Sequence, residues 1–199
     1  MGLFRQAIIH LDTNQLLGYE VLLAHPRDTL NLASASGTLL DLDQFILKTA
    51  YGMANKEAHL LIFVNVAAES LIARLLPFAP DGIPNNLVLE ISERVPMDMN
   101  EIREFLKPYR KQGLQIALTD VTTGVKMFND YAALMPDFLK LHWTDHKDTL
   151  RAGVSCARSL NLPLVIGRIE TKDQANWALR CGIPYAQGFH YGRMEEVAL

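Results

Sequence analysis

Short apolar runs alternate with helix-length segments along most of this chain, and this alternation restricts the fold more strongly than any other feature. The periodicity predicts strands near residues 60–66, 86–91, 115–119, 137–142, 163–168 and 184–187. It predicts helices near residues 68–76, 98–112, 124–134, 146–160 and 172–181. Strands that are apolar on both faces and alternate with helices form a parallel sheet that the helices cover.

The N-terminal part departs from this alternation. Two apolar runs, residues 4–11 and 16–23, are joined by a short polar turn, so they are predicted to pair as antiparallel strands. A helix is predicted over residues 42–57, with Phe45 on its apolar face and Asp41 or Asp43 near its N-terminus. The first strand is therefore expected to run against the rest of the sheet.

An open doubly wound sheet and a closed barrel both satisfy this order of elements. The glycine-rich nucleotide-binding fingerprint expected of an open sheet is absent. In barrels of this type the functional residues lie at the carboxyl ends of several strands, which is where this chain carries polar residues. We therefore expect an α/β fold, a TIM-like (β/α) barrel with an antiparallel first strand, formed by residues 1–199 as one domain.

Composition excludes several classes of function. The net charge is -3 and no basic stripe stands out, so neither nucleic acid nor a membrane surface is expected as a partner. The two cysteines, Cys156 and Cys181, exclude a disulfide framework and a cysteine-based zinc site. No apolar run has the length of a signal-peptide core or a membrane span, so a cytoplasmic location is predicted.

Seven apolar runs each carry one polar or charged side chain near their C-terminal end. These residues are Glu20, Asn65, Glu90, Asp120, Lys140, Glu170 and Gln187. A carboxylate in a buried strand costs several kcal/mol unless it is paired or bound to a metal, so this series predicts one shared site.

The chemistry of these residues suggests metal-assisted phosphodiester hydrolysis. Oxygen ligands suited to a hard divalent cation such as Mg²⁺ or Mn²⁺ come from four of them: Glu20, Asn65, Glu90 and Asp120. Lys140 is able to contact a phosphate or a bound water, and Gln187 to hydrogen-bond a base. Glu170 stands at a predicted helix start, where a structural role is favoured over ligation.

Seven segments in order resemble EAL domains, bacterial barrel proteins that hydrolyse or bind cyclic di-GMP. The segments are GYEVLL with Glu20, VNVAAESL with Asn65, LVLEISE with Glu90, ALTDVTTG with Asp120, PDFLKLH with Lys140, LVIGRIET with Glu170 and AQGFHYGRM with Gln187. The resemblance spans essentially the whole chain. It implies a barrel that works in bacterial signal transduction through cyclic di-GMP.

The chain departs from the pattern of this family at several site positions. Thr119 stands where the family has an aspartate that bridges two metals, and Gly167 where it has a glutamate at the second metal. Ala24 replaces an arginine that contacts the ligand phosphate. Arg168 replaces a glycine, so its side chain is expected near the metal pocket. His142 replaces an aspartate and is expected at an edge or an interface.

These departures imply that two-metal catalysis fails, because two dications about 3.5–4 Å apart need shared anionic ligands. We therefore predict a degenerate EAL domain that is not an enzyme and that regulates through an unidentified protein partner or a homodimer. The alternatives are a receptor that binds cyclic di-GMP without hydrolysing it and a weak phosphodiesterase.

The departures also set the expected ligands. No cofactor is required, and the carboxylates Glu20, Glu90 and Asp120 are expected either to form an ion network with Lys140 or Arg168 or to hold at most one Mg²⁺ or Mn²⁺. Cyclic di-GMP binding is expected to be weak or absent. Any contact with it would come from the vestigial residues Asn65, Lys140 and Gln187.

Overall fold

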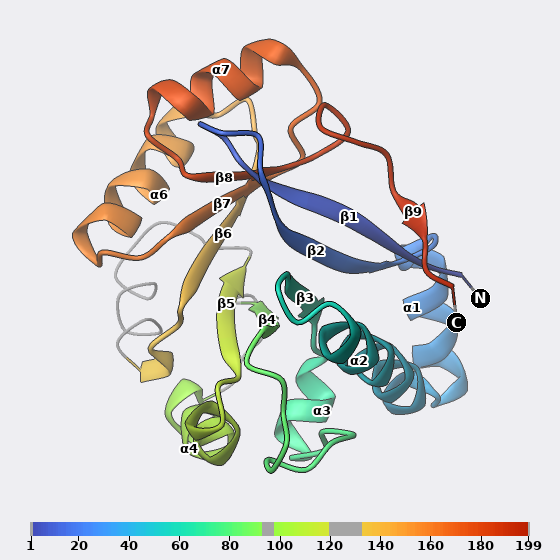
Figure 1. The fold of residues 1–199 in the computed structure, drawn as a ribbon. Helices are drawn as coiled ribbons and strands as arrows, with labels where there is room; N and C mark the ends of the chain where they lie inside the picture. The colour runs from blue at the N-terminus through green and yellow to red at the C-terminus, as the bar shows by residue number, and fades with distance from the viewer. Residues whose placement is uncertain (1, 93–97, 120–132, 199) are drawn as a thin grey trace.

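The computed structural model describes residues 2–92, 98–119 and 133–198, and its strands form the predicted barrel (Figure 1). The strands of the described residues are β1 (Leu3–His10), β2 (Leu16–Leu23), β3 (Leu61–Asn65), β4 (Leu87–Ser92), β5 (Gln115–Thr119), β6 (Phe138–His142), β7 (Leu164–Gly167), β8 (Tyr185–Gln187) and β9 (Glu195–Glu196). Strands β2 to β8 are successive parallel neighbours. Strand β1 closes the ring by pairing antiparallel with both β2 and β8, which confirms the predicted TIM-like barrel and its antiparallel first strand.

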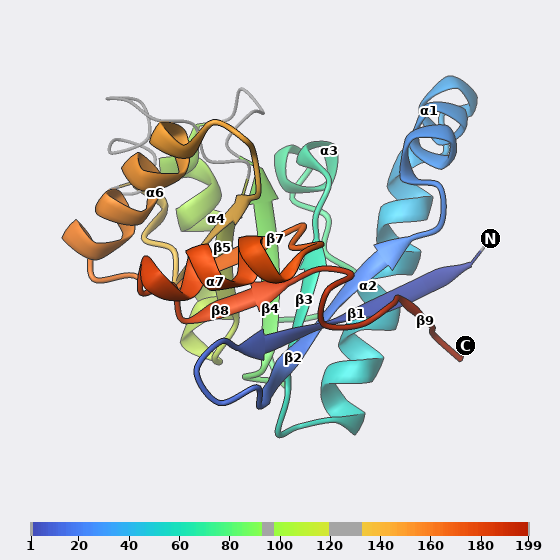
Figure 2. The ribbon, with the colours of Figure 1, turned by 90° about the horizontal axis from the view of Figure 1, so that it is seen from above.

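The helices lie outside the ring of strands (Figures 1 and 2). Those of the described residues are α1 (Pro26–Ser36), α2 (Leu39–Lys56), α3 (Ala68–Ile72), α4 (Met99–Lys111), α6 (Lys147–Ser159) and α7 (Lys172–Arg180). Local sequence sets their ends. Thr171 and Gln174 form a capping box at the start of α7. Gly113 and Gly182 adopt positive φ angles of 110° and 66° just beyond α4 and α7, where glycine commonly ends a helix.

The barrel interior contains an apolar layer, formed by one inward-facing side chain from each of six strands. Its members are Ile8, Phe63, Val88, Ala117, Phe138 and Val165. Phe63 and Phe138 pack edge to face, with ring centroids 5.3 Å apart. Because successive strand residues point to opposite faces, the next inward-facing residue of each strand lies two positions further on. This spacing brings the polar residues of the sequence pattern into one layer above the apolar one.

Helix α1 was not predicted from the sequence. Pro26 occupies its first turn, where the missing N–H costs nothing, and Gly37 ends it with a φ of 72°. Leu32 on this helix is 71% exposed, so α1 lacks the clear apolar face on which a periodicity prediction depends. In Figure 2 the helix stands beside α2 at the edge of the molecule.

One prediction for α2 needs correction: Phe45, expected on the apolar face, is 36% exposed. Of the two acidic residues predicted near the helix start, Asp41 lies in the first turn, whereas Asp43 is 5% exposed. Because α2 already begins at Leu39, Asp43 falls in its second turn and faces the β3–α3 connection. Its Oδ1 accepts a hydrogen bond of 3.0 Å from the Ala67 N–H, and burial raises the pKa of its carboxyl group. Asp120 and most of the helix predicted for residues 124–134 lie outside the described residues.

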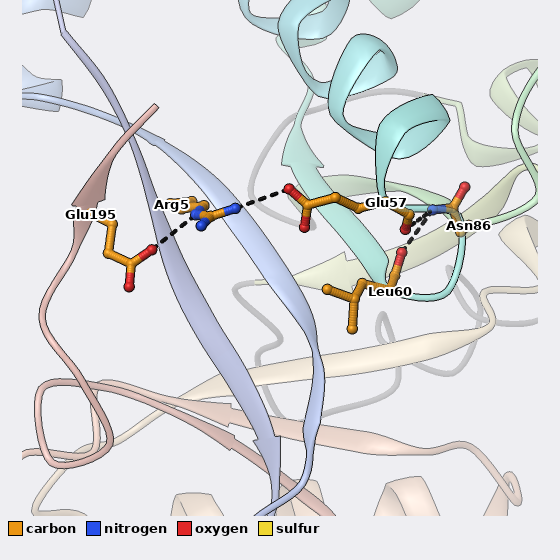
Figure 3. Close-up of polar contacts among 5 residues, drawn as sticks. All are labelled: Arg5, Glu57, Leu60, Asn86 and Glu195. Atoms are coloured by element: carbon orange, nitrogen blue, oxygen red, sulfur yellow. Dashed lines mark hydrogen bonds and ion pairs between the residues drawn. The ribbon is translucent and has the colours of Figure 1, made fainter. Parts of the chain in front are cut away.

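Buried and half-buried polar contacts hold α2 to the barrel (Figure 3). Asn86 lies just before β4 and is 5% exposed. Its amide nitrogen is within hydrogen-bond distance of three backbone oxygens, those of Ala54 (3.1 Å), Glu57 (3.1 Å) and Leu60 (2.7 Å). Arg5 on β1 pairs with Glu57 at 2.9 Å and with Glu195 on β9 at 3.0 Å. These contacts fix the turn from which β3 enters the barrel.

Candidate functional site

A pocket of about 970 Å³ opens at the carboxyl ends of the parallel strands. It is lined by five of the seven residues that were predicted to share a site: Glu20, Asn65, Glu90, Glu170 and Gln187. All of these except Glu170 lie on strands, each on a different one, and the register places Asn65 beside Glu90 across β3 and β4. The structure therefore brings together residues that are up to 167 positions apart, through the contact of Glu20 with Gln187.

A buried ion cluster forms the floor of this site. The Lys140 ammonium lies 2.8 Å from Glu20 Oε2 and 2.6 Å from Glu90 Oε1. The three side chains are 1%, 8% and 2% exposed, respectively. Lys140 is not among the pocket-lining residues, because its ammonium is enclosed by the two carboxyl groups. These contacts correspond to the ion network with Lys140, which is one of the two arrangements predicted for the carboxylates.

Two amide side chains complete the hydrogen bonding of Glu20. Asn65 Nδ2 donates to Oε1 at 3.1 Å, and Gln187 Nε2 donates to Oε2 at 2.6 Å. With Lys140, Glu20 thus has three donors from three other strands. A buried carboxylate with this number of partners is held in one orientation, and its negative charge is stabilised.

The two carboxyl groups of the cluster titrate in opposite directions. Burial raises the pKa of Glu90 to about 8, and the negative charge of Glu20 adds to this rise against the opposing effect of Lys140. For Glu20, burial is outweighed by the ammonium of Lys140 and by the hydrogen bond from Gln187, so its pKa is lowered. Burial likewise opposes the charge of Lys140, but the two glutamates raise its pKa. Near neutral pH the buried cluster therefore carries one negative and one positive charge.

The described residues of the site include donors suited to a divalent cation. Glu20, Glu90 and Asn65 offer oxygen atoms of the kind that Mg²⁺, Mn²⁺ or Ca²⁺ prefers. Within residues 2–92, 98–119 and 133–198, however, no group of three or more acidic, histidine or cysteine side chains gathers at one point. The ammonium of Lys140 already lies where a cation would contact both carboxylates. The fourth predicted ligand, Asp120, lies outside the described residues.

Three of the five departures from the family pattern, Thr119, Gly167 and Ala24, lie in different places. Thr119 is 3% exposed at the end of β5 and lines the pocket. Gly167 ends β7 and also lines the pocket, where it offers backbone alone. Ala24 follows β2 and is not among the lining residues; its backbone bonds to Gly2 and Thr29.

His142 was expected at an edge or an interface, and the structure corrects this prediction. It lines the pocket as the last residue of β6, directly beside Gly167 of β7. A Cβ atom placed on Gly167 would lie 2.9 Å from His142 Cδ2 and 3.5 Å from Nε2. The imidazole therefore occupies space that any side chain at position 167 would need. The sequence did contain a signal, because both His142 and Gly167 depart from the family pattern. The two positions are neighbours only through the register of β6 with β7, which the sequence alone does not show.

Arg168 and Glu170 lie at the rim of the pocket. Arg168 is exposed, lines the pocket and has a φ of 63°, an uncommon angle for a residue with a long side chain. Glu170 also lines the pocket, and its backbone N–H donates to Gln174 of the α7 capping box at 2.6 Å. Phe189 was not singled out from the sequence; it lines the pocket and is 56% exposed.

Comparison with known proteins decides the family. The family model of the EAL domain matches residues 2–194. This chain belongs to the EAL domain family. It is therefore an EAL domain of cyclic di-GMP signalling, as its seven sequence segments predicted.

Two solved structures resemble this EAL domain closely. The PaMucR phosphodiesterase in complex with cyclic di-GMP, from Pseudomonas aeruginosa, superposes with a TM-score of 0.84 at 25% identity and covers 98% of this chain and 97% of that one. The YkuI protein of Bacillus subtilis, in complex with cyclic di-GMP and calcium, superposes with a TM-score of 0.76 at 27% identity. That match covers 99% of this chain and 56% of YkuI.

A relative found by sequence comparison is about as similar to this chain as the two solved structures are. The "Probable cyclic di-GMP phosphodiesterase PdeG" of Escherichia coli (strain K12) is 26% identical over 94% of this chain. The chain spans 43% of the length of PdeG and 22% of that of the related PdeB. The relatives thus contain further sequence beyond the region that corresponds to this EAL domain.

These comparisons contradict the prediction that the chain is not an enzyme. PdeG and PaMucR are both named as phosphodiesterases, and the matches to them extend over at least 94% of this chain. The altered positions Thr119 and Gly167 change the site, but they do not remove the chain from a family of enzymes.

Among the helices of the described residues, none combines the length and apolarity that a membrane span requires.

Proposed function

We propose that this EAL domain binds cyclic di-GMP in the pocket at the carboxyl ends of its strands, and that binding there is its regulatory role in signalling. One observation carries the proposal: the pocket of about 970 Å³ lies over the Glu20, Asn65 and Gln187 cluster, at the strand ends where barrel enzymes bind their ligands. The likeness to PaMucR, whose structure contains cyclic di-GMP, supports the same site.

The lining of the pocket offers groups suited to a purine dinucleotide. Phe189 exposes its ring at the rim, where a guanine base has room to stack on it. The amides of Asn31 and Asn65 also belong to residues of the lining and are able to hydrogen-bond base edges or ribose hydroxyls. Apolar residues of α1 and α2, including Leu30 and Ile46, supply the contact area.

A second candidate function is phosphodiester hydrolysis, and a specific observation favours it. Glu20, Glu90 and Asn65 gather beside the pocket and would hold a single divalent cation. Such an ion supplies Lewis-acid polarisation of a phosphoryl oxygen and lowers the pKa of a bound water. Lys140 holds the two carboxyl groups together, so its ammonium would have to move for the ion to enter.

Calorimetric titration of the pure chain with cyclic di-GMP tests the binding proposal. We expect saturable heat with one nucleotide site, and a weaker affinity for Phe189→Ala by roughly 5- to 150-fold, because base stacking on an aromatic ring contributes about 1–3 kcal/mol. Leu179→Ala is the control, since Leu179 is 43% exposed on α7 and lies outside the pocket lining. Absence of heat at millimolar nucleotide would refute the proposal.

Chromatography of the same mixture tests hydrolysis. Incubation with Mn²⁺, with Mg²⁺ and with a chelator separates metal-dependent turnover to the linear dinucleotide from simple binding. Turnover that depends on the metal and is lost in Glu20→Gln supports the second candidate. Turnover that is equal in all three conditions would exclude a role for a cation.

The partner and the location belong to the same proposal. Leu30 of α1 lines the pocket, and Leu32 on the same helix is 71% exposed, which supports a link between nucleotide binding and contact with a protein or a second copy of the chain. Light scattering with and without cyclic di-GMP tests the homodimer. A cytoplasmic location and a single domain over residues 1–199 stay predictions.

A further inference from the structure

The pocket contains few positive charges for a ligand that carries two phosphates. Five acidic residues line it: Glu20, Asp43, Glu69, Glu90 and Glu170. Among the described lining residues, Arg168 is the one with a permanent positive charge. Lys140 is enclosed by Glu20 and Glu90 and does not reach the pocket. A phosphate that enters this pocket must therefore find its counter-charge mainly at the ends of β6 and β7.

Arg168 has an unfavourable backbone conformation at this place. Its φ of 63° lies in the left-handed region, which costs about 1–2 kcal/mol for a residue with a Cβ atom. Glycine avoids this cost. Strain of this kind clusters at functional sites. The guanidinium is exposed and forms no hydrogen bond or ion pair in the described part of the chain, so its five N–H donors face the pocket and solvent.

His142 lies next to Arg168 because of the strand register. His142 pairs with Gly167, the residue immediately before Arg168. The imidazole lies over the bare Cα of Gly167, within 2.9 Å of the point where a Cβ atom would stand. It is close enough to the cluster to help lower the pKa of Glu20 by its charge. His142 and Arg168 thus lie at the ends of two neighbouring strands, and both line the pocket.

We propose that Arg168 and His142 form a phosphate-binding corner, which holds a phosphodiester group of the nucleotide with the guanidinium as counter-charge and the imidazole as a second donor. This inference rests on the proposed function, because it assigns a subsite within the same pocket. It explains why an arginine occupies a glycine-like conformation at the rim. It also explains why position 167 carries no side chain, since the ring of His142 needs that space.

Calorimetric titration with cyclic di-GMP, together with thermal unfolding, tests the phosphate-binding corner. The affinity for the nucleotide and the midpoint temperature of unfolding are expected to respond differently to loss of Arg168. Arg168→Gly removes the charge and also the backbone strain. We expect its affinity to fall about tenfold or more, as for loss of a charge-assisted hydrogen bond, while its midpoint temperature of unfolding stays equal or rises. Arg74→Gly is the matched control, because Arg74 is an exposed arginine with a φ of 56° that does not line this pocket.

Two further variants separate charge from structure. Arg168→Lys keeps the positive charge and should retain part of the affinity, whereas Arg168→Gln should bind as weakly as Arg168→Gly. His142→Phe keeps a ring over Gly167 but removes both nitrogens, so we expect weaker binding than in the wild-type chain. Affinities that follow the midpoint temperature instead of the charge would overturn the inference.

The wild-type titration distinguishes the inference from the proposed function. If the wild-type chain binds cyclic di-GMP and Arg168→Gly binds equally tightly, the corner is wrong and the proposed function stands. If the wild-type chain does not bind the nucleotide, both are wrong. If Arg74→Gly loses as much affinity as Arg168→Gly, the effect is a general one of the substitution and the corner is again overturned.

Discussion

Removal of the Lys140 ammonium tests whether this one charge holds the floor of the pocket. Lys140→Met conserves most of the side-chain length but leaves the carboxyl groups of Glu20 and Glu90 without their shared cation, at positions that are 8% and 2% exposed. Breaking a buried ion pair by removal of one partner costs about 3–5 kcal/mol, because the remaining charge is buried without compensation. For a chain of this size, that corresponds to a fall of roughly 6–20 °C in midpoint temperature.

Urea denaturation in a chelator-containing buffer, followed by the fluorescence of Trp143 and Trp177, measures this loss. Lys107→Met is the matched control. Lys107 is 57% exposed and pairs with Glu104 within one helix, so its loss should change the free energy of unfolding by less than about 0.5 kcal/mol. An equal free energy of unfolding for Lys140→Met and the wild-type chain would refute the view that the ammonium stabilises the cluster.

The same variant tests the competition between Lys140 and a metal ion. With the ammonium gone, a divalent cation is the remaining counter-charge for Glu20 and Glu90. A cation present at 100 times its dissociation constant would restore about 2.7 kcal/mol. We therefore expect Mn²⁺ to stabilise Lys140→Met more than the wild-type chain. Equal stabilisation of both proteins would show that the ammonium does not occupy the cation position.

Three shorter predictions concern individual side chains. Asn86→Ala leaves three backbone oxygens without their shared donor and should lower the free energy of unfolding by about 1–3 kcal/mol in urea titrations. Between the unfolded pKa of 4.5 and the folded value of about 8, Glu90 keeps its proton when folded and loses it when unfolded, so wild-type stability should fall across this range. Glu90→Gln should flatten that dependence in urea titrations at several pH values. Gly167→Ala should push His142 aside and weaken cyclic di-GMP binding in calorimetry, with no further loss when His142→Ala is already present.

Those features of the fold that depend on local periodicity were predictable from the sequence. The strand that ends at Asn65 and the strand that ends at Gln187 were both found within one residue of their observed bounds, because an apolar run is followed by one polar residue. The same rule placed Glu20, Glu90 and Lys140 in one site, since the carboxyl ends of parallel strands meet at one edge of a barrel.

Features that depend on neighbours across the sheet were not predictable. His142 looked like an edge residue because its immediate neighbours in sequence carry no sign of the pocket. Its position follows from the register with Gly167, which is 25 residues further along the chain, and from the absence of a side chain there. The contact of Asp43 was not predicted for a similar reason: the hydrogen bond that it accepts from the Ala67 N–H joins α2 to the β3–α3 connection.

The two cationic residues of the site, Lys140 and Arg168, differ in what they contact. Lys140 pairs with Glu20 and Glu90 and is buried between them, so its ammonium has no surface toward a ligand. Arg168 is exposed and forms no ion pair in the described part of the chain, so its charge is open to a ligand. Its left-handed φ of 63° costs backbone strain, and strain of this kind is expected where a residue serves a binding site. The proposed phosphate-binding corner therefore gives this strained arginine a function, because its counterpart is a ligand that carries negative charge.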